Sequence, residues 1–178
     1  MVSKEVDLRK LIQEYPDFPK QGVLFRDINP VLRNAKALDF IAEEFKNRLN
    51  GRKIDLVVGI ESRGFIIATA IALKFQVGLV VVRKAGKLPG QTIKKSYEIE
   101  YGSAIMEMQV SALDKNQAVL VADDLIATGG TAMASAKIIE ELGSRVVGFA
   151  FLVELGKLRG GMILRNLGYN VISLAVYN

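Results

Sequence analysis

The chain has 178 residues, half of them hydrophobic, which is enough to bury one substantial core, and we expect a single domain. It contains neither cysteine nor histidine. This composition excludes disulfides, thiolate or imidazole metal sites, cysteine or histidine nucleophiles and imidazole general bases. Any acid or base chemistry must therefore come from aspartate, glutamate, lysine or tyrosine.

The formal charge of +5 is compatible with nucleic acid or with small polyanions as partners. Basic residues cluster between Arg83 and Lys95, where glycine and proline interrupt them and no interleaved aromatic residues suit a single-stranded nucleic acid. The longest apolar stretch, 65–73, is too short to span a bilayer. We expect a cytoplasmic protein that binds small anions rather than nucleic acid or membrane.

The first half of the chain predicts the start of a parallel sheet. Apolar residues at helical spacing favour a short amphipathic helix over 3–15, followed by a proline-rich turn. A helix over 37–49, a strand over 54–60, a helix over 64–75 and a strand over 79–82 come next. This alternation is the βαβ pattern of a parallel sheet covered by helices.

The second half predicts an inserted hairpin and then a continuation of the same pattern. Residues 97–100 and 104–109 flank a Tyr-Gly-Ser turn and predict two antiparallel strands. The remaining elements are a strand over 118–122, a helix over 132–142, a strand over 146–153 and a strand over 171–176.

Residues 119–131 are the most informative segment for function. An apolar run ends in Asp123 and Asp124, which should emerge at the carboxyl end of a buried strand, where ligands of open α/β sheets bind. The loop 127–131 then offers backbone N–H groups, two threonine hydroxyls and two glycines ahead of a helix N-terminus, which favours negative charge. A phosphate cradle beside two hydroxyl acceptors fits a ribose 5-phosphate.

Simpler interpretations of this segment exist. Two acidic residues after a strand also occur in solvated turns, and an apolar run ending in aspartate resembles the Mg²⁺-binding strand of P-loop ATPases. The second interpretation needs a G-x-x-x-x-G-K-[ST] motif, which the chain lacks, and there is no G-x-G-x-x-G motif for a dinucleotide.

A second junction between a strand and a helix carries Ser62 and Arg63. Alone, this pair is an ordinary helix cap with a surface arginine. Together with the phosphate cradle and the basic loop after Arg83, it predicts a substrate with a phosphate at one end and a polyanionic group at the other. Phosphoribosyl pyrophosphate is such a molecule.

Residues 119–131 resemble the phosphoribosyl pyrophosphate signature of type I phosphoribosyltransferases. That resemblance implies an α/β fold with a mostly parallel central sheet flanked by helices, an inserted flexible hairpin lid over 83–103, a small hood, and an N-terminal cap and base-binding segment over 1–30. Further segments resemble the adenine-specific members in order and spacing: 18–19, 22–30, 62–65, 83–90, 96–102 and 152–155.

The resemblance implies a glycosyltransferase of purine salvage, which converts adenine and phosphoribosyl pyrophosphate into AMP and pyrophosphate. It implies a homodimer, and Mg²⁺ held mainly by substrate and water rather than by direct protein ligands. It also implies a non-proline cis bond between Glu61 and Ser62.

Residue roles follow from the same resemblance. Asp123 and Asp124 would accept hydrogen bonds from the ribose hydroxyls and offset an oxocarbenium charge, Arg83 would neutralise the leaving pyrophosphate, and Glu100 would handle the purine proton. The implied phosphoribosyl pyrophosphate set is Ser62, Arg63, Arg83, Lys84, Lys87, Asp123, Asp124, Ala127, Thr128, Gly129, Gly130 and Thr131, and the implied adenine set is Leu24, Phe25, Arg26 and Leu155.

The chain departs from the family in two places. Glu61 stands where some relatives carry aspartate, and residues 109–111 lack an acidic residue that some relatives have, so the anchoring of the lid is expected to differ. Two other functions stay open. One is a phosphoribosyltransferase for another base, such as xanthine or hypoxanthine; the other is a regulator that senses phosphoribosyl pyrophosphate, binds nucleic acid and has lost catalysis.

Overall fold

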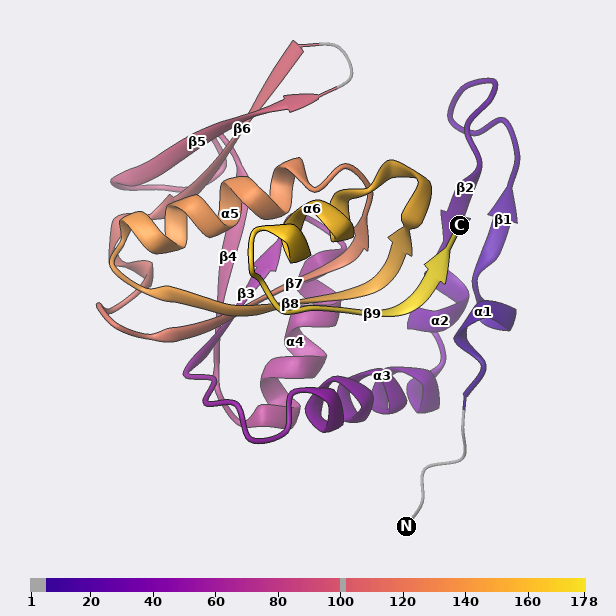
Figure 1. Ribbon diagram of the computed structural model, residues 1–178, viewed down its shortest axis with the longest axis horizontal. Coiled ribbons are helices and arrows are strands. Elements are labelled where there is room, and N and C mark those ends of the chain that lie inside the picture. Colours follow the sequence, from indigo (N-terminus) through magenta and orange to yellow (C-terminus); the bar gives the residue numbers. More distant parts are fainter. Residues whose placement is uncertain (1–5, 100–101) are drawn as a thin grey trace.

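A seven-stranded sheet forms the centre of the computed structural model, which describes residues 6–99 and 102–178 (Figure 1). Its strands are β3 (Leu56–Ile60), β4 (Gly78–Lys84), β5 (Thr92–Ile99), β6 (Gly102–Gln109), β7 (Ala118–Ile126), β8 (Arg145–Leu155) and β9 (Val171–Tyr177). They lie in the order β5-β6-β4-β3-β7-β8-β9. The five strands β4, β3, β7, β8 and β9 are parallel, and β6 pairs antiparallel with both β4 and β5. The predicted α/β fold with a mostly parallel sheet is confirmed.

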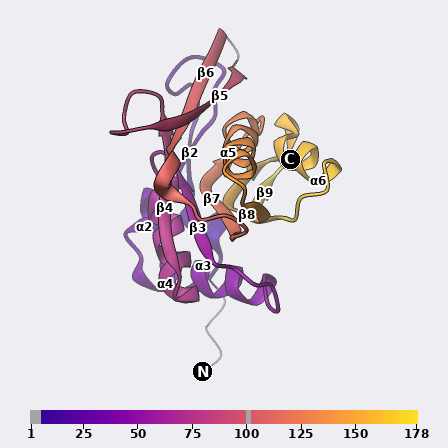
Figure 2. The ribbon, with the colours of Figure 1, turned by 90° about the vertical axis from the view of Figure 1, so that its left-hand side faces the viewer.

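Helices cover both faces of the sheet. The helices α3 (Ala35–Arg48) and α4 (Gly64–Phe75) lie on one face, whereas α5 (Gly130–Glu141) and α6 (Gly160–Asn166) lie on the other (Figure 2). Alternate residues of one strand therefore enter different cores: Leu120 packs with the α3 and α4 side, and Val121 with the α5 side. In the part of the chain that the structure describes, no helix has both the length and the apolar character needed to cross a membrane.

The N-terminal segment differs from its prediction. The sequence predicts a helix over 3–15, but α1 spans only Leu8–Leu11. The end of the predicted helix is wrong, because strand β1 (Gln13–Tyr15) follows α1. Tyr15 precedes a proline, which disfavours helical backbone, and β1 finds an antiparallel partner in β2 (Phe25–Asp27). A one-turn helix, α2 (Asn29–Leu32), leads from there into α3.

The predicted hairpin is present, with longer strands. Thr92–Ile99 and Gly102–Gln109 pair without a break in register, so Lys94 and Lys95 belong to a strand and not to a loop. The hairpin projects from the sheet and contacts α5 (Figure 1). Glu100, the predicted proton-handling residue, lies outside the described residues together with Tyr101.

The predicted strand over 118–122 is shorter than the observed strand β7. β7 continues to Ile126, and Asp123 pairs with Phe151 of β8 inside the ladder. The acidic pair is therefore part of the strand, because the apolar run of β8 offers ladder partners beyond the point where the apolar run of β7 stops. The next helix begins at Gly130, two residues before its predicted start at 132.

Helix α6 was not predicted. Its first residues, Gly160 and Gly161, resemble a loop because glycine is unfavourable in helices, and no serine, threonine, aspartate or asparagine side chain caps its start. It follows a single turn of 3₁₀ helix over Gly156–Leu158, and a second such turn, Val110–Ala112, follows β6.

The core on the α3 and α4 side should dominate the stability of the fold. Phe45 on α3 is fully buried there, and Phe45→Ala should lower the free energy of unfolding by about 3–5 kcal/mol through lost burial and a cavity. Leu167→Ala, directly after α6, is the control, since Leu167 is 59% exposed. Denaturant titration measures both; equal effects would contradict this assignment of the core.

Candidate active site

Two adjacent carboxylates lie buried near the carboxyl end of β7. Asp123 and Asp124 are each 7% exposed. The backbone N–H of Asp124 donates to Asp123 Oδ1 at 2.8 Å, and Arg63 Nε lies 2.7 Å from Asp124 Oδ2. The start of α4 also presses on this pair: a Cβ on Gly64 would lie 2.5 Å from Asp123 Oδ1 and 3.0 Å from its Cα. Only glycine fits at this position.

The electrostatics of the pair follow from its burial. Loss of hydration and the neighbouring Asp124 carboxylate raise the pKa of Asp123 well above its ordinary value, and Arg63 opposes this shift. Burial also raises the pKa of Tyr97, and the charge of Asp123 adds to that shift. Burial thus disfavours the ionised form of Asp123, and hydrogen-bond donors or groups that gain positive charge would stabilise that form.

The predicted phosphate loop, residues 127–131, follows β7 directly. Gly129 has a φ of +87°, a left-handed conformation that favours glycine, and its carbonyl accepts the Met133 N–H at 2.9 Å. The loop opens the 12-residue helix α5, whose first backbone N–H groups have no partner within the helix. The acidic pair and an anion-attracting helix N-terminus thus belong to one junction between a strand and a helix.

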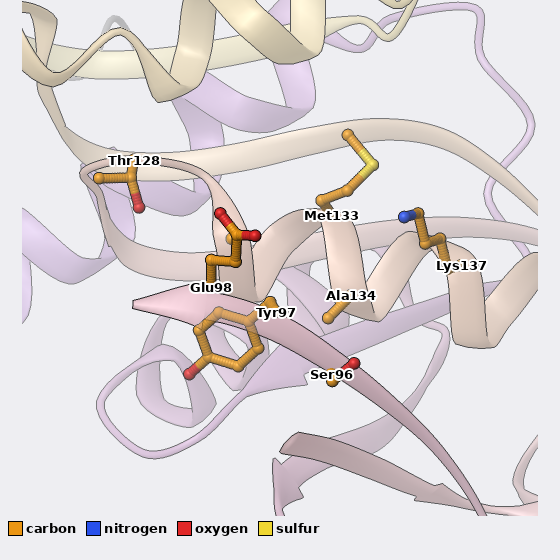
Figure 3. Close-up of a pocket in the computed structure, with 8 residues that line it drawn as sticks. Ser96, Tyr97, Glu98, Thr128, Met133, Ala134 and Lys137 are labelled. Atoms are coloured by element: carbon orange, nitrogen blue, oxygen red, sulfur yellow. The ribbon is translucent and has the colours of Figure 1, made fainter. Parts of the chain in front are cut away.

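A pocket of about 370 Å³ adjoins this loop (Figure 3). The hairpin closes on the loop at this point: a Cβ on Gly130 would lie 2.7 Å from Tyr97 Cδ2. Tyr97 was not among the predicted site residues, because an aromatic residue in a hairpin gives no sign of what it packs against. The lining residues are Ser96, Tyr97 and Glu98 of β5, Thr128 and Gly130 of the loop, and Met133, Ala134 and Lys137 of α5.

The second predicted anion site lies after β3. The Glu61–Ser62 peptide bond is cis, as the family resemblance implies. Glu61 Oε2 accepts hydrogen bonds from Arg83 Nε at 3.1 Å and from the Lys84 backbone N–H at 3.0 Å, and Lys87 Nζ contacts Oε1. Burial works against ionisation, yet the bonds from Lys87, Lys84 and Arg83 hold the pKa of Glu61 below its ordinary value. Three of the residues predicted to meet pyrophosphate, Arg83, Lys84 and Lys87, therefore converge on one carboxylate.

A second glutamate anchors the basic loop. Glu107 on β6 is buried, and its Oε1 accepts the backbone N–H groups of Lys87 at 2.8 Å and Leu88 at 3.0 Å. Gln109 Nε2 donates to Pro89 O at 3.1 Å. The anchoring expected to differ from some relatives thus uses Glu107 and Gln109. One acidic residue inside the apolar strand of residues 104–109 was the available signal for it.

The predicted base-binding segment contacts the acidic site through Arg63. The guanidinium carbon of Arg63 lies 5.5 Å from the centroid of the Phe25 ring, and Phe18 packs edge-on against Phe25 at 5.2 Å. Arg63 was predicted to hold pyrophosphate, but in this structure it bridges Asp124 and Phe25.

Tyr177 contacts two other predicted base-binding residues, Arg26 and Leu155. The guanidinium carbon of Arg26 lies 3.9 Å from the Tyr177 ring centroid, and Arg26 Nη2 is 3.2 Å from Glu14 Oε1. Tyr177 in turn is the ladder partner of Leu155. Leu24, the fourth predicted residue, is exposed. A tyrosine near the end of an ordinary strand carries no functional signal, so Tyr177 was not predicted.

The chain is similar in sequence and in structure to known proteins. Residues 28–171 match the sequence family of the phosphoribosyl transferase domain. The adenine phosphoribosyltransferase of Nitrosopumilus maritimus is 51% identical over 87% of this chain and 91% of its own length. The crystal structure of adenine phosphoribosyltransferase from Thermoanaerobacter pseudethanolicus has a TM-score of 0.91 at 45% identity, covering 96% of this chain and 98% of that one. The Trypanosoma brucei enzyme, solved in complex with AMP, pyrophosphate and ribose-5-phosphate, has a TM-score of 0.85 at 28% identity, covering 99% and 82%.

The burial of Asp123 predicts a pH-dependent stability. A raised folded-state pKa means that protonated Asp123 favours the fold below the ordinary pKa of aspartate, and that this contribution is lost as the pH rises through the folded pKa. Asparagine does not ionise, so Asp123→Asn should gain stability relative to the wild type between about pH 4 and about pH 8. Denaturant unfolding at both pH values measures the change. A difference that is independent of pH would contradict the assignment.

Proposed function

The chain belongs to the adenine phosphoribosyltransferases, and on that premise we propose how its own residues carry out the reaction. Ribose 5-phosphate passes from phosphoribosyl pyrophosphate to adenine, which gives AMP and pyrophosphate and is a pentosyl transfer of purine salvage. The observation that carries the proposal is the junction after β7, where the buried pair Asp123 and Asp124 lies two residues before the loop Ala127, Thr128, Gly129, Gly130 and Thr131.

The sugar and its phosphate would bind at this junction. The carboxylates of Asp123 and Asp124 accept hydrogen bonds from the two ribose hydroxyls, and the loop N–H groups hold the 5′-phosphate. As the bond to pyrophosphate lengthens, the sugar gains positive charge. The two carboxylates would stabilise that charge more strongly than water would, because they are buried and poorly hydrated, and the developing charge would in turn favour the ionised form of Asp123.

Pyrophosphate would take the place of Glu61 as the partner of the basic residues. Arg83 and Lys87 already meet at the Glu61 carboxylate, and a pyrophosphate group carries more negative charge than one carboxylate. Ser62 and Arg63, at the start of α4, complete the site. Arg63 would then exchange its contact with Asp124 for the leaving group, which frees that carboxylate for the sugar.

The base would lie between Phe25 and Leu155. Adenine needs an acceptor for its 6-amino group, and a backbone carbonyl in the segment Leu24 to Arg26 supplies one. Arg26 is held by Tyr177 and Glu14, so its backbone is fixed next to this opening. Glu100 remains the predicted proton-handling residue on grounds of family resemblance.

Magnesium would arrive with the substrate. Within residues 6–99 and 102–178, no group of three or more acidic, histidine or cysteine side chains is placed to hold a metal ion, so these residues do not fit a dedicated metal site. Mg²⁺ prefers phosphate oxygens and water as ligands, and pyrophosphate supplies the former. Magnesium bound mainly through substrate and water is therefore part of the proposal.

Closure of the hairpin would protect the activated sugar from water. Residues 83–103 form the proposed lid of one catalytic domain, and Tyr97 already contacts Gly130 of the phosphate loop. Water competes with adenine for the sugar, so its exclusion favours transfer over hydrolysis.

A cytoplasmic location remains the prediction made from the sequence.

A homodimer would cover exposed apolar residues near the basic loop. Ile66 and Leu73 on α4, Leu79 on β4 and Ile105 on β6 are exposed, and these elements contact one another in the order α4, β4, β6. The mass measured by light scattering should be twice that of the chain. A monomer at micromolar concentration would contradict this proposal.

Base selectivity tests the proposed function. With Mg²⁺ and phosphoribosyl pyrophosphate, pyrophosphate release should occur with adenine and not with hypoxanthine, guanine, xanthine or orotate. Turnover with another base would keep the sugar site but overturn Leu24 to Arg26 as the adenine-binding segment. Binding of phosphoribosyl pyrophosphate with no turnover on any base would favour the regulator.

The acidic pair should matter for turnover far more than for folding. Asp123→Asn and Asp124→Asn should each lower kcat by about 10²–10³-fold, the range found when one preorganised electrostatic group is removed. Neither variant should have a lower melting temperature at neutral pH, and Asp123→Asn should have a higher one, because it no longer buries a charge at that position. Asp39→Asn on α3 is the matched control, because Asp39 is exposed and pairs only with Lys74 among the described residues. Unchanged kinetics in both variants would remove the pair from the mechanism.

A further inference from the structure

The phosphate loop has a close neighbour that the reaction itself does not require. The Gly160 N–H at the start of α6 donates to Ala127 O at 2.9 Å. A Cβ on Gly160 would overlap Ala127 O and would lie 2.6 Å from Gly129 N and 2.7 Å from Thr128 C. All three are backbone atoms and cannot rotate away. The backbone of α6 therefore rests directly on the loop, with no room for a side chain between them.

The next residue of α6 rests on a buried charge. A Cβ on Gly161 would overlap Glu154 Oε1 and would lie 2.5 Å from Glu154 Cδ. Glu154 is 5% exposed and forms a two-bond ion pair with Arg165, one turn further along α6: Nη1 to Oε1 and Nη2 to Oε2 are both 2.8 Å. Ser173 Oγ on β9 donates to Glu154 Oε2 at 2.6 Å. Glu154 thus holds α6 from two successive turns.

These contacts form a continuous path from Glu154 to the loop. Glu154 lies opposite Ile126, the residue before the loop, in the ladder between β7 and β8. The hydrogen bonds from Arg165 hold the pKa of Glu154 below its ordinary value against the effect of burial, so the charge that binds α6 persists. From Glu154 the path runs through Gly161 and Gly160 to the loop backbone.

We propose that the Glu154–Arg165 ion pair is a positioning device for the 5′-phosphate loop, acting through the backbone contact of Gly160 and Gly161. The inference deepens the proposed function and rests on it. Neither Glu154 nor Arg165 need touch the substrate. Their effect is to fix the loop N–H groups where a phosphate can accept from several of them at once, and a displacement of about 1 Å in such a group can cost about 10²-fold in rate.

The test separates the two ends of the substrate. Ribose 5-phosphate and pyrophosphate are titrated separately, in the presence of Mg²⁺, by calorimetry against the wild type, Gly160→Ala, Arg165→Met and Arg165→Lys. Ribose 5-phosphate affinity should fall by at least about tenfold in Gly160→Ala, and by less in Arg165→Met. Pyrophosphate affinity should stay within about twofold in every variant, and Arg165→Lys should recover part of the loss.

Gly168→Ala is the matched control for general destabilisation. Gly168 follows α6 with a φ of +89°, so alanine is strained there, but its Cβ would meet no atom within 4 Å. Its affinities for both ligands should equal those of the wild type. If Gly160→Ala fails to fold, Arg165→Met still tests the inference. The Arg165 side chain is 42% exposed, so its replacement should disturb the fold less.

Two results would overturn the inference. One is unchanged ribose 5-phosphate affinity in both Gly160→Ala and Arg165→Met, and the other is an equal loss of affinity for both ligands. A wild-type chain that binds neither ligand and does not turn over adenine would overturn the proposed function itself, and the inference with it.

Discussion

The burial of two adjacent carboxylates at the end of β7 is the constraint on which the site depends. Asp123 and Asp124 are each 7% exposed, and the start of α4 lies against Asp123, where Gly64 leaves no room for a side chain. Burying such a pair is unfavourable unless hydrogen bonds or cations compensate. Arg63 supplies part of that compensation here, and a ribose with developing positive charge would supply more.

Glutamates hold the cations and the loop around that pair. Glu61 collects Arg83 and Lys87, and Glu107 fixes the backbone of the same basic loop from β6. Glu154 supports the phosphate loop from the opposite side of β7. The site proposed for a substrate rich in negative charge is thus organised by acidic side chains, which orient its cations and N–H groups.

Much of this could be predicted from the sequence, because the strands of the parallel sheet are continuous apolar runs and the junction after β7 combines acidic, glycine and threonine residues. The errors concern the ends of single elements and contacts between residues that are distant in sequence. The end of β7 was placed before Asp123, since charged residues resemble a strand end when the partner strand is unknown. The glycines that begin α6 resemble a loop until their contacts with Ala127 and Glu154 are seen. Tyr177 and Tyr97 act through neighbours that are distant in sequence.

The most direct test of the central claim compares ribose 5-phosphate with 2-deoxyribose 5-phosphate by calorimetry. If the buried carboxylates bind the ribose hydroxyls, the wild type should bind the deoxy sugar at least about tenfold more weakly, because a hydrogen bond to a charged group contributes about 1.5–3 kcal/mol. That discrimination should disappear in Asp123→Asn or in Asp124→Asn, whichever residue accepts the 2′-hydroxyl. Equal affinity of the wild type for the two sugars, or discrimination that persists in both variants, would contradict it.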